Sequence, residues 1–379
     1  MGKERTDISM VDLTGQYLRL KPEIDEAMQQ VLNRGDYING AAVKNFSNAL
    51  AGYLETDYVV PCANGTDALQ AALMALNLTR GDEVITSAFS FVSTVEVIVL
   101  LGLKPVFVDI DPDTYNIDTD AIRNALTERT RVVVPVHLFG QPAQMDEIME
   151  IALSHNLYVV EDGAQSMGAS CMVRGNQYKA GTVGHIGCTS FFPTKNLGCF
   201  GDGGACFTND EQLAGRLKMI MNHGARKKYF NEIIGMNSRL DTLQAAVLSE
   251  KLTHLDDFID RRRSASRIYL EGLKDVSELN LPHQTEQSTH TFNQFTVRVL
   301  DGKRDELKQF LAHEGIPSMV YYPFPLHRQP AFEVLSKGDL HLPESELACI
   351  EVLSLPMHTE MTEAQQEYII QRIKMFFGK

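Results

Sequence analysis

The sequence predicts a two-domain α/β protein, with a large domain built on a mostly parallel sheet and a smaller α+β domain at the C-terminal end. A chain of 379 residues is long for one ordinary domain and short for three. Its 44% hydrophobic and 22% charged residues allow a sizeable core and exclude disordered, collagen-like or small disulfide-rich proteins. Short β-rich runs alternate with helical patterns through the first half, which is typical of α/β folds. We place the large domain at 1–245 and the bridging helix with the small domain at 246–379.

The large domain is predicted to begin with helices and to continue as an alternation of strands and helices. From Lys21 to Tyr53, apolar residues recur at helical spacing. Five β-rich runs then alternate with helical stretches, which predicts a mostly parallel sheet covered on both faces, and two further runs complete seven strands. The predicted strands are Tyr58–Cys62, Glu83–Thr86, Pro105–Asp109, Val132–Val136, Tyr158–Asp162, Cys188–Phe192 and Ala205–Thr208.

The alternation of strands and helices ends near Gly235. A long helical pattern, from Leu240 to about Leu273, follows and is predicted to connect the two domains. The small domain has fewer segments with a clear hydrophobic pattern, and these segments include both strands and helices. Its predicted strands are Thr291–Val299 and Ser318–Tyr322, and its predicted helices are Asp305–Glu314 and Glu363–Phe377.

Charge and hydropathy exclude several classes of partner. The net charge of -14 argues against nucleic acid or an anionic membrane as the main ligand. The most apolar segment, Val92–Val108, is interrupted by Glu96, Gly102, Lys104 and Pro105, and the N-terminus lacks the apolar stretch of a signal peptide, so no membrane span is expected. The six cysteines form no CxxC pair and have no histidine at zinc-ligand spacing. We therefore expect reduced thiols, a cytoplasmic protein and no metal site.

The most informative stretch places one lysine, Lys195, between a strand-like run and a cluster of glycines. A lone lysine is usually a solvated surface residue. Here Pro193 stiffens the entry to the segment, and the glycines permit positive φ and close approach of the backbone to a ligand. Lys195 is therefore predicted to have a chemical function. The glycines are Gly198, Gly201, Gly203 and Gly204.

Two further groups follow predicted strands. Asp162 ends the run Tyr158–Asp162, at the edge where open α/β sheets bind ligands, and its carboxylate is suited to a protonated ring nitrogen. Gln165 offers an amide for a phenolic oxygen. Gly65 and Thr66 open a helix after the first strand, where free amides suit a phosphate. Ordinary helix capping is the alternative reading of Asp162 and of Thr66.

These features together predict the cofactor. The sequence has no Walker loop and no GxGxxG after the first strand, which weakens the case for nucleotide hydrolysis or dinucleotide binding. A phosphate, a protonatable ring nitrogen, a phenolic oxygen and an aldehyde that a lysine captures are all present in pyridoxal 5′-phosphate. We expect that cofactor.

Five separated motifs carry a resemblance to the DegT/DnrJ/EryC1/StrS family of sugar aminotransferases, from about Leu13 to Pro356. The resemblance implies the fold type I architecture of pyridoxal-phosphate enzymes, which is shared with aspartate aminotransferase. The motifs are Asn64-Gly-Thr-Asp-Ala-Leu69, Glu161-Asp-Gly-Ala-Gln-Ser166, Ser190-Phe-Phe-Pro-Thr-Lys195, Gly201-Asp-Gly-Gly204 and Gly235-Met-Asn-Ser-Arg-Leu-Asp241.

The resemblance also implies roles for individual residues. Lys195 binds the cofactor's aldehyde and, with Asp162, is catalytic; Asp162 pairs with the ring nitrogen and Gln165 approaches the phenolic oxygen. Phe91 stacks on the cofactor face, with a plain core aromatic as the alternative. Asn237 reaches the phosphate from a neighbouring subunit, which implies a homodimer with active sites at the interface. The residues implied to hold the phosphate within one chain are Gly65, Thr66 and Ser190.

The implied reaction is transamination between L-glutamate and a UDP-linked keto sugar. Dehydratases of the family carry histidine where Lys195 stands, so the lysine favours amino transfer. Segments 290–298 and 316–332 resemble the branch that aminates C3, and further segments resemble enzymes acting on UDP-2-acetamido-2-deoxy-3-oxo-glucuronate for O-antigen synthesis. The implied substrate-binding residues are Arg239, Tyr321, Tyr322 and His327.

Two alternatives remain open at this stage. One is amination at C4 of a dTDP- or UDP-4-keto sugar. The other is a regulatory relative that keeps the fold and the cofactor without turnover, because fold alone does not establish activity.

Overall fold

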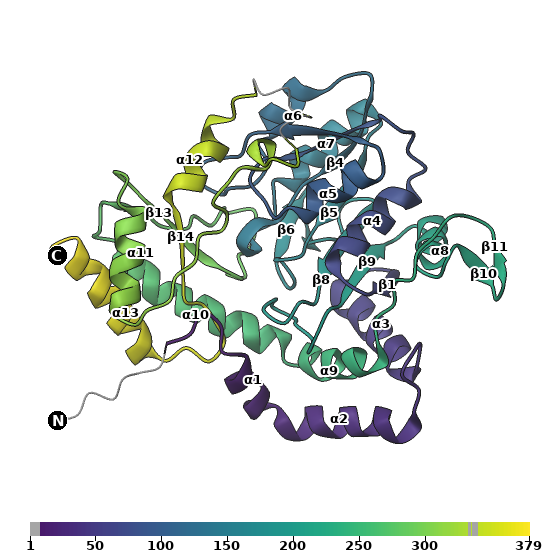
Figure 1. Ribbon diagram of the computed structural model, residues 1–379, viewed down its shortest axis with the longest axis horizontal. Coiled ribbons are helices and arrows are strands. Elements are labelled where there is room, and N and C mark those ends of the chain that lie inside the picture. The colour runs from purple at the N-terminus through teal and green to yellow at the C-terminus, as the bar shows by residue number, and fades with distance from the viewer. Residues whose placement is uncertain (1–7, 333–334, 336–339) are drawn as a thin grey trace.

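The computed structural model describes residues 8–332, 335 and 340–379. The central sheet and its helices lie above a row of N-terminal helices, and the C-terminal elements lie to one side (Figure 1). A thin hairpin projects from the opposite side (Figure 1). Among the residues that the structure describes, no helix is both long and apolar enough to cross a membrane.

The N-terminal region is helical, as predicted. The pattern over 21–53 forms two helices, α2 and α3, because Gly35 ends the first in the left-handed conformation at φ 69°. Ile24 and Phe46 are fully buried on the inner faces of these helices. The helices are α1 (Leu13–Arg19), α2 (Lys21–Arg34) and α3 (Ala41–Leu54).

The central sheet of the described chain has seven strands in the order β1-β9-β8-β5-β4-β2-β3, and β9 runs antiparallel to both of its neighbours. The other pairings are parallel, so the predicted mostly parallel sheet is confirmed. The strands are β1 (Tyr58–Cys62), β2 (Glu83–Ser87), β3 (Lys104–Val108), β4 (Thr130–Val134), β5 (Tyr158–Asp162), β8 (Ile186–Ser190) and β9 (Gly204–Thr208).

Helices cover both faces of this sheet. Val132 and Val133 are neighbours in β4, yet their side chains join different apolar clusters, because successive residues of a strand point to opposite faces. The covering helices are α4 (Gly65–Ala75), α5 (Ser93–Leu100), α6 (Thr119–Ala125), α7 (Met145–His155) and α8 (Glu211–Ile220). The same region also contains a 3-10 turn, η1 (Leu138–Gly140), and two hairpins, β6 (Ser170–Val173)–β7 (Asn176–Lys179) and the projecting β10 (Ala225–Lys227)–β11 (Phe230–Asn231).

The small domain is an antiparallel sheet packed on helices. The predicted long helix over 240–273 is two helices, because Thr253 and His254 interrupt it. The predicted division between residues 245 and 246 falls within the first of them and stays a prediction. The elements are α9 (Thr242–Leu252), α10 (Leu255–Leu273), β12 (Leu279–Asn280), β13 (Phe295–Val299), α11 (Arg304–His313), η2 (Leu326–Arg328), α12 (Pro343–Glu351), β14 (Val352–Leu355) and α13 (Glu363–Phe376).

Two strand predictions in the small domain are corrected. Segment 318–322 is not a strand: Met319 alone bridges Ser354, and the chain then leaves the sheet toward the large domain. The predicted strand over 291–299 begins only at Phe295. Before it, the carbonyls of Phe292 and Asn293 accept hydrogen bonds from the buried Arg262 guanidinium instead of a neighbouring strand.

Candidate active site

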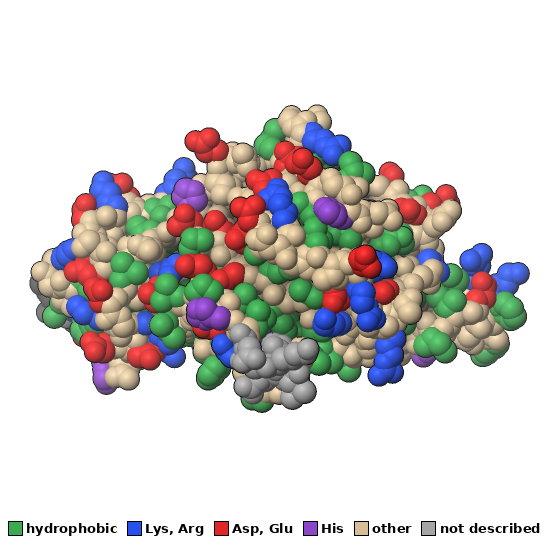
Figure 2. Space-filling model, turned by 90° about the horizontal axis from the view of Figure 1, so that it is seen from above, with side chains coloured by type: hydrophobic (Ala, Val, Ile, Leu, Met, Phe, Trp, Pro, Cys, Tyr) green, Lys and Arg blue, Asp and Glu red, His purple; other side chains and the backbone are tan. Residues whose placement is uncertain are grey.

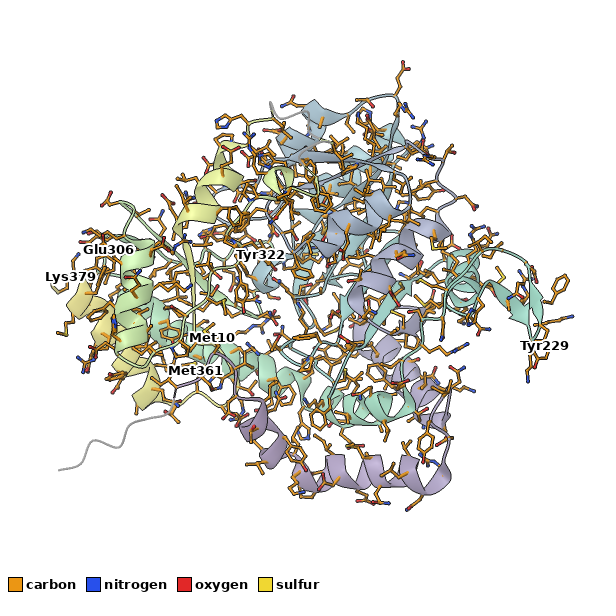
Figure 3. All side chains as sticks on the ribbon, in the orientation of Figure 1. Met10, Tyr229, Glu306, Tyr322, Met361 and Lys379 are labelled. Carbon is orange, nitrogen blue, oxygen red and sulfur yellow. The ribbon has the colours of Figure 1, made fainter. Side chains whose placement is uncertain are left out.

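A cavity of about 490 Å³ lies where the carboxyl ends of β5 and β8 meet the N-terminus of α4 and the segment with Tyr321 and Tyr322, which comes from the small domain. Tyr322 lies near the middle of the molecule, between the central sheet and the C-terminal elements (Figure 3). The cavity brings together nine residues that the sequence singled out, from five separate segments. They are Gly65, Thr66, Phe91, Asp162, Gln165, Ser190, Lys195, Tyr321 and Tyr322.

Lys195 lies on the turn that follows β8, with its side chain partly exposed to the cavity. Burial by the surrounding protein lowers the pKa of the Lys195 ammonium, and the nearby Asp162 carboxylate opposes this effect. Desolvation is the larger of the two influences. The amine is therefore free of its proton more often than an ordinary lysine, as a nucleophile toward an aldehyde requires.

Asp162 is the last residue of β5 and is 5% exposed. Its carboxylate accepts hydrogen bonds from the Thr94 hydroxyl at 2.7 Å and from the Ala164 amide at 3.2 Å. Thr94 comes from α5 and was not singled out in the sequence, because its contact with Asp162 depends on the neighbouring strands of the folded sheet. A buried carboxylate held in this way is suited to a cationic partner in the cavity.

Gln165 has a fixed orientation. Its side-chain oxygen accepts a hydrogen bond from the Phe139 amide at 2.6 Å, and its nitrogen donates to the Tyr322 hydroxyl at 3.1 Å. Phe139 holds a positive φ of 57° within η1, which turns its amide toward Gln165. Neither contact has a local signal in the sequence. Because Tyr322 comes from the small domain, the Gln165 side chain connects the large-domain wall of the cavity to the small-domain wall.

Gly65 and Ser190 form one end of the cavity. Asn64 caps α4 by accepting a hydrogen bond from Asp67, so the first residues of the helix present free backbone amides. A Cβ atom built at Gly65 would lie 2.8 Å from the Ser190 Cβ atom, so the strand end and the helix end are in close contact. This arrangement of amides and hydroxyls suits a phosphate.

Replacing Gly65 by alanine is expected to weaken cofactor binding about 10-fold or more, because the added methyl group must push Ser190 or the start of α4 away. Equilibrium dialysis of pyridoxal phosphate measures this directly. Gly52→Ala, in α3, is the matched control, since nothing lies within 4 Å of its added Cβ atom. Equal affinities of the two variants would contradict the assignment of this end of the cavity.

Aromatic rings form a wall of the cavity. The Phe91 side chain is 54% exposed and faces the cavity, which distinguishes it from a core aromatic. Its ring centroid lies 6.2 Å from that of Tyr322, which in turn lies 6.0 Å from that of the buried Phe89. Burial raises the pKa of the Tyr322 hydroxyl, so Tyr322 stays protonated and able to donate.

Asn237 and Arg239 lie outside this cavity, among the described residues. Arg239 donates to the side-chain oxygens of Asn237 at 2.5 Å and Asn222 at 3.1 Å, beside a separate groove of about 440 Å³. The hairpin β10–β11 projects nearby, with Tyr229 at its tip, far from Tyr322 (Figure 3). Basic and hydrophobic side chains crowd this tip (Figure 2). A single chain therefore does not place Asn237 or Arg239 at Lys195.

His327 also lies outside the described lining of the cavity. Its side chain is fully buried, and its Nε2 atom lies 3.0 Å from a carboxylate oxygen of Glu346. Burial is the main cause that lowers the pKa of His327. Arg328 contacts the same carboxylate at 3.1 Å. The geometry gives His327 a packing role between η2 and α12.

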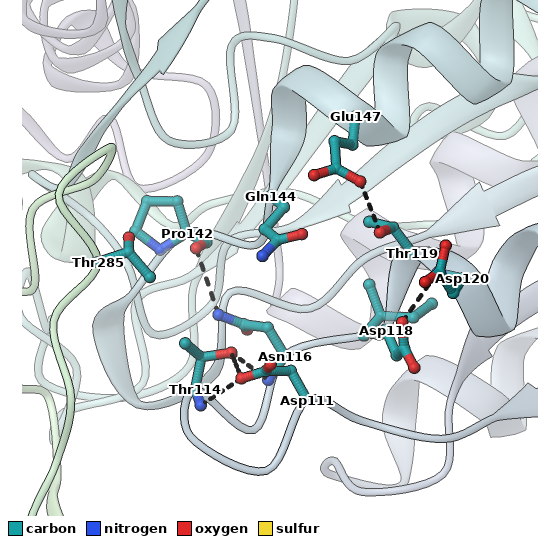
Figure 4. A pocket seen from close by; sticks show the side chains of 11 residues that line it. Asp111, Thr114, Asn116, Asp118, Thr119, Asp120, Pro142, Gln144, Glu147 and Thr285 are labelled. Carbon is teal, nitrogen blue, oxygen red and sulfur yellow. Dashed lines mark hydrogen bonds between the residues drawn. The ribbon is translucent and has the colours of Figure 1, made fainter.

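A second pocket, of about 240 Å³, is lined by carboxylates and has a different character (Figure 4). Asp111 accepts from Thr114, and Glu147 accepts from Thr119, so these carboxylates already bond within the protein. None of its described lining residues is a lysine, so the pocket offers no amine to an aldehyde. The groups suited to an aldehyde cofactor therefore lie in the cavity around Lys195.

The groups of the larger cavity fit pyridoxal phosphate. A lysine with lowered pKa, a buried carboxylate, an oriented amide and a helix N-terminus correspond to its aldehyde, ring nitrogen, phenolic oxygen and phosphate. The fold and these groups define a pyridoxal-phosphate-dependent enzyme, and the match to an aminotransferase family makes it an aminotransferase.

Residues 19–374 match the DegT/DnrJ/EryC1/StrS aminotransferase family, and the chain belongs to that family. It is 44% identical over 98% of its length to a pleiotropic regulatory protein of Geobacillus stearothermophilus, which is covered to 99%. It is 42% identical over 96% of its length to the UDP-2-acetamido-2-deoxy-3-oxo-D-glucuronate aminotransferase of Pseudomonas aeruginosa, covered to 98%. It is 39% identical over 98% of its length to a dTDP-3-amino-3,4,6-trideoxy-alpha-D-glucose transaminase of Streptomyces venezuelae, covered to 96%.

Solved structures agree on the fold. A DegT DnrJ EryC1 StrS aminotransferase from Brucella abortus has a TM-score of 0.93 and 41% identity, over 98% of this chain and 100% of that one. NtdA from Bacillus subtilis, with bound cofactor PMP, has a TM-score of 0.90 and 30% identity, over 100% of this chain and 87% of that one. The predicted fold type I architecture is confirmed.

Proposed function

We propose that this protein transfers an amino group from L-glutamate to C3 of a UDP-linked 3-keto sugar, most specifically UDP-2-acetamido-2-deoxy-3-oxo-glucuronate, for surface polysaccharide synthesis. The observation that carries the proposal is the convergence of Lys195, Asp162 and Gln165 in one cavity. The similarity to the Pseudomonas aeruginosa enzyme over nearly the whole of both chains supports the choice of sugar.

In this proposal, the bound cofactor supplies an electron sink for the carbanion formed at the substrate carbon. Lys195 would hold the cofactor through its aldehyde and would move a proton at the substrate carbon, for which its lowered pKa suits it. Asp162, whose carboxylate is held in place by Thr94, would pair with the ring nitrogen. Gln165 would hold the phenolic oxygen, and Phe91 would pack against the ring. Gly65, Thr66 and Ser190 would hold the phosphate.

We further propose that Tyr321 and Tyr322 contact the sugar nucleotide, since both line the same cavity as Lys195. Asn237 and Arg239 would act on the cavity of a second copy in a homodimer. Two features support this: Arg239 lines a separate groove, and it donates a hydrogen bond that orients the Asn237 side chain. The cation of Arg239 suits a diphosphate.

Mixing two inactive variants tests the shared site. Lys195→Ala and the double variant Asn237→Ala/Arg239→Ala are each expected to show little activity alone. When they are unfolded and refolded together, mixed dimers contain one intact site, so activity should recover to about a quarter of the wild-type value. Lys195→Ala refolded alone is the control. If the mixture gains no activity although mixed dimers form, the two residues do not serve a second copy.

Product analysis tests the regiochemistry. Enzyme, L-glutamate and a UDP-3-keto sugar should yield a sugar amine whose NMR spectrum places nitrogen on C3. The chain is also similar to a dTDP-sugar transaminase, so dTDP- and UDP-4-keto sugars are the competing substrates to compare. A product aminated only at C4 would contradict the proposal.

One observation favours a second candidate, a regulatory protein without turnover: the 44% identity to a relative named a pleiotropic regulatory protein. The 42% identity to a relative named an aminotransferase, over nearly the whole of both chains, weighs against it. Detectable amino transfer from L-glutamate to a sugar nucleotide separates the two candidates.

A further inference from the structure

A second buried lysine lies close to the turn that carries Lys195. Lys251, near the end of α9, is 2% exposed. Burial lowers the pKa of its ammonium to about 8. Lysine is rarely buried so deeply without a carboxylate partner, because removing an ammonium from water is costly. The contacts of Lys251 indicate what offsets that cost.

Lys251 reaches the segment after Lys195. Its Nζ atom donates a hydrogen bond to the Gly198 carbonyl at 2.9 Å and lies 4.7 Å from the centroid of the Phe200 ring. The first contact is a charge-assisted hydrogen bond and the second is a cation–π interaction. Both favour a lysine over an apolar residue at this position.

Gln244 contacts the same segment from the same helix. Its side-chain oxygen accepts a hydrogen bond from the Phe200 amide at 2.8 Å, and its side-chain nitrogen donates one to the Phe200 carbonyl at 3.4 Å. Residues seven apart lie on one face of a helix. Gln244 and Lys251 together, the Gln244–Lys251 pair, therefore fix the backbone of Gly198 and Phe200 to α9.

The turn between Lys195 and Gly198 has little freedom to absorb a shift. The Lys195 amide donates to the Phe192 carbonyl at 2.8 Å. A Cβ atom at Gly198 would lie 2.4 Å from the Pro193 carbonyl oxygen, so the two ends of the turn are in direct contact. A displacement of Gly198 is thereby transmitted to the backbone that carries Lys195.

We propose that Lys251 is a positioning residue for Lys195: with Gln244 it fixes the turn over 193–200 so that the Lys195 amine stays aligned in the cavity. This inference rests on the proposed function of Lys195. Small displacements of a reacting group are sufficient to lower its rate substantially.

The test is Lys251→Met, which keeps an unbranched side chain that is one atom shorter and removes the donor and the charge. We expect kcat of the holoenzyme to fall by about 10-fold or more while KM for both substrates changes less than about threefold. Hydrogen–deuterium exchange of amides over 194–201 should be faster, in the holoenzyme and in the cofactor-free protein. Lys303→Met is the matched control, since Lys303 lies 5.9 Å from the Phe377 ring in the small domain.

Unchanged kcat together with unchanged exchange over 194–201 would overturn the inference. If Lys251→Met does not fold, Lys251→Gln and Gln244→Leu replace it, and both should raise exchange in the same segment and affect kcat non-additively when combined. The exchange measurement does not depend on turnover. If Lys195→Ala is fully active while exchange in Lys251→Met still rises, the proposed function of Lys195 is contradicted. The hydrogen bond by which Lys251 fixes the turn is then still supported.

Discussion

Replacing Lys195 by alanine is expected to lower kcat by about 10²- to 10⁴-fold, the range typical of losing a general acid–base group. The variant loses the amine whose pKa burial lowers, and with it the two functions that we propose for that amine, capture of the aldehyde and proton transfer at the substrate carbon. Steady-state kinetics with L-glutamate measures the loss. Pyridoxal phosphate should still bind, because the groups around Gly65 and Ser190 remain, but without the absorption band of the lysine-bound form.

Lys303→Ala is the matched control for this variant. Lys303 is an exposed residue before α11, in the small domain, and its replacement should leave kcat unchanged. A Lys195→Ala protein with wild-type turnover would remove Lys195 from the reaction.

Replacing Asp162 by asparagine should lower kcat by about 10²-fold, equivalent to roughly 2.7 kcal/mol of transition-state stabilisation. Asparagine keeps the size of the side chain and a hydrogen-bonding oxygen for Thr94, but it has no negative charge to keep a ring nitrogen protonated. Kinetics and the cofactor's absorption spectrum measure the change.

Asp118→Asn is the control, because Asp118 caps α6 and asparagine caps helices about as well. If Asp162→Asn and Asp118→Asn have the same kcat, then the charge of Asp162 has no part in the reaction.

The large domain was predictable because its sheet is buried on both faces. Runs such as Val132–Val134 are apolar at every position, which few structures other than a covered parallel strand explain. The small domain gave weaker signals. Strand β14 has only four residues before Pro356 and was not predicted, and the segment of Tyr321 and Tyr322 has the composition of a strand but turns toward the cavity.

The place of a residue in the cavity was predictable where that residue follows a strand or opens a helix, as Asp162 and Gly65 do. The residues that orient these groups were not predictable, because their contacts join segments distant in sequence. Thr94 meets Asp162 from 68 positions away, and the Phe139 amide meets Gln165 from 26. His327 shows the reverse: the resemblance implied a substrate contact, whereas the fold buries its ring against Glu346.

The absorption spectrum of the purified holoenzyme, recorded before and after addition of L-glutamate, tests the central claim most directly. We predict a near-visible band of lysine-bound cofactor that disappears with L-glutamate, as the cofactor takes up the amino group, and returns when a UDP-3-keto sugar is added. A band that neither L-glutamate nor another amino donor alters would contradict amino transfer by this protein.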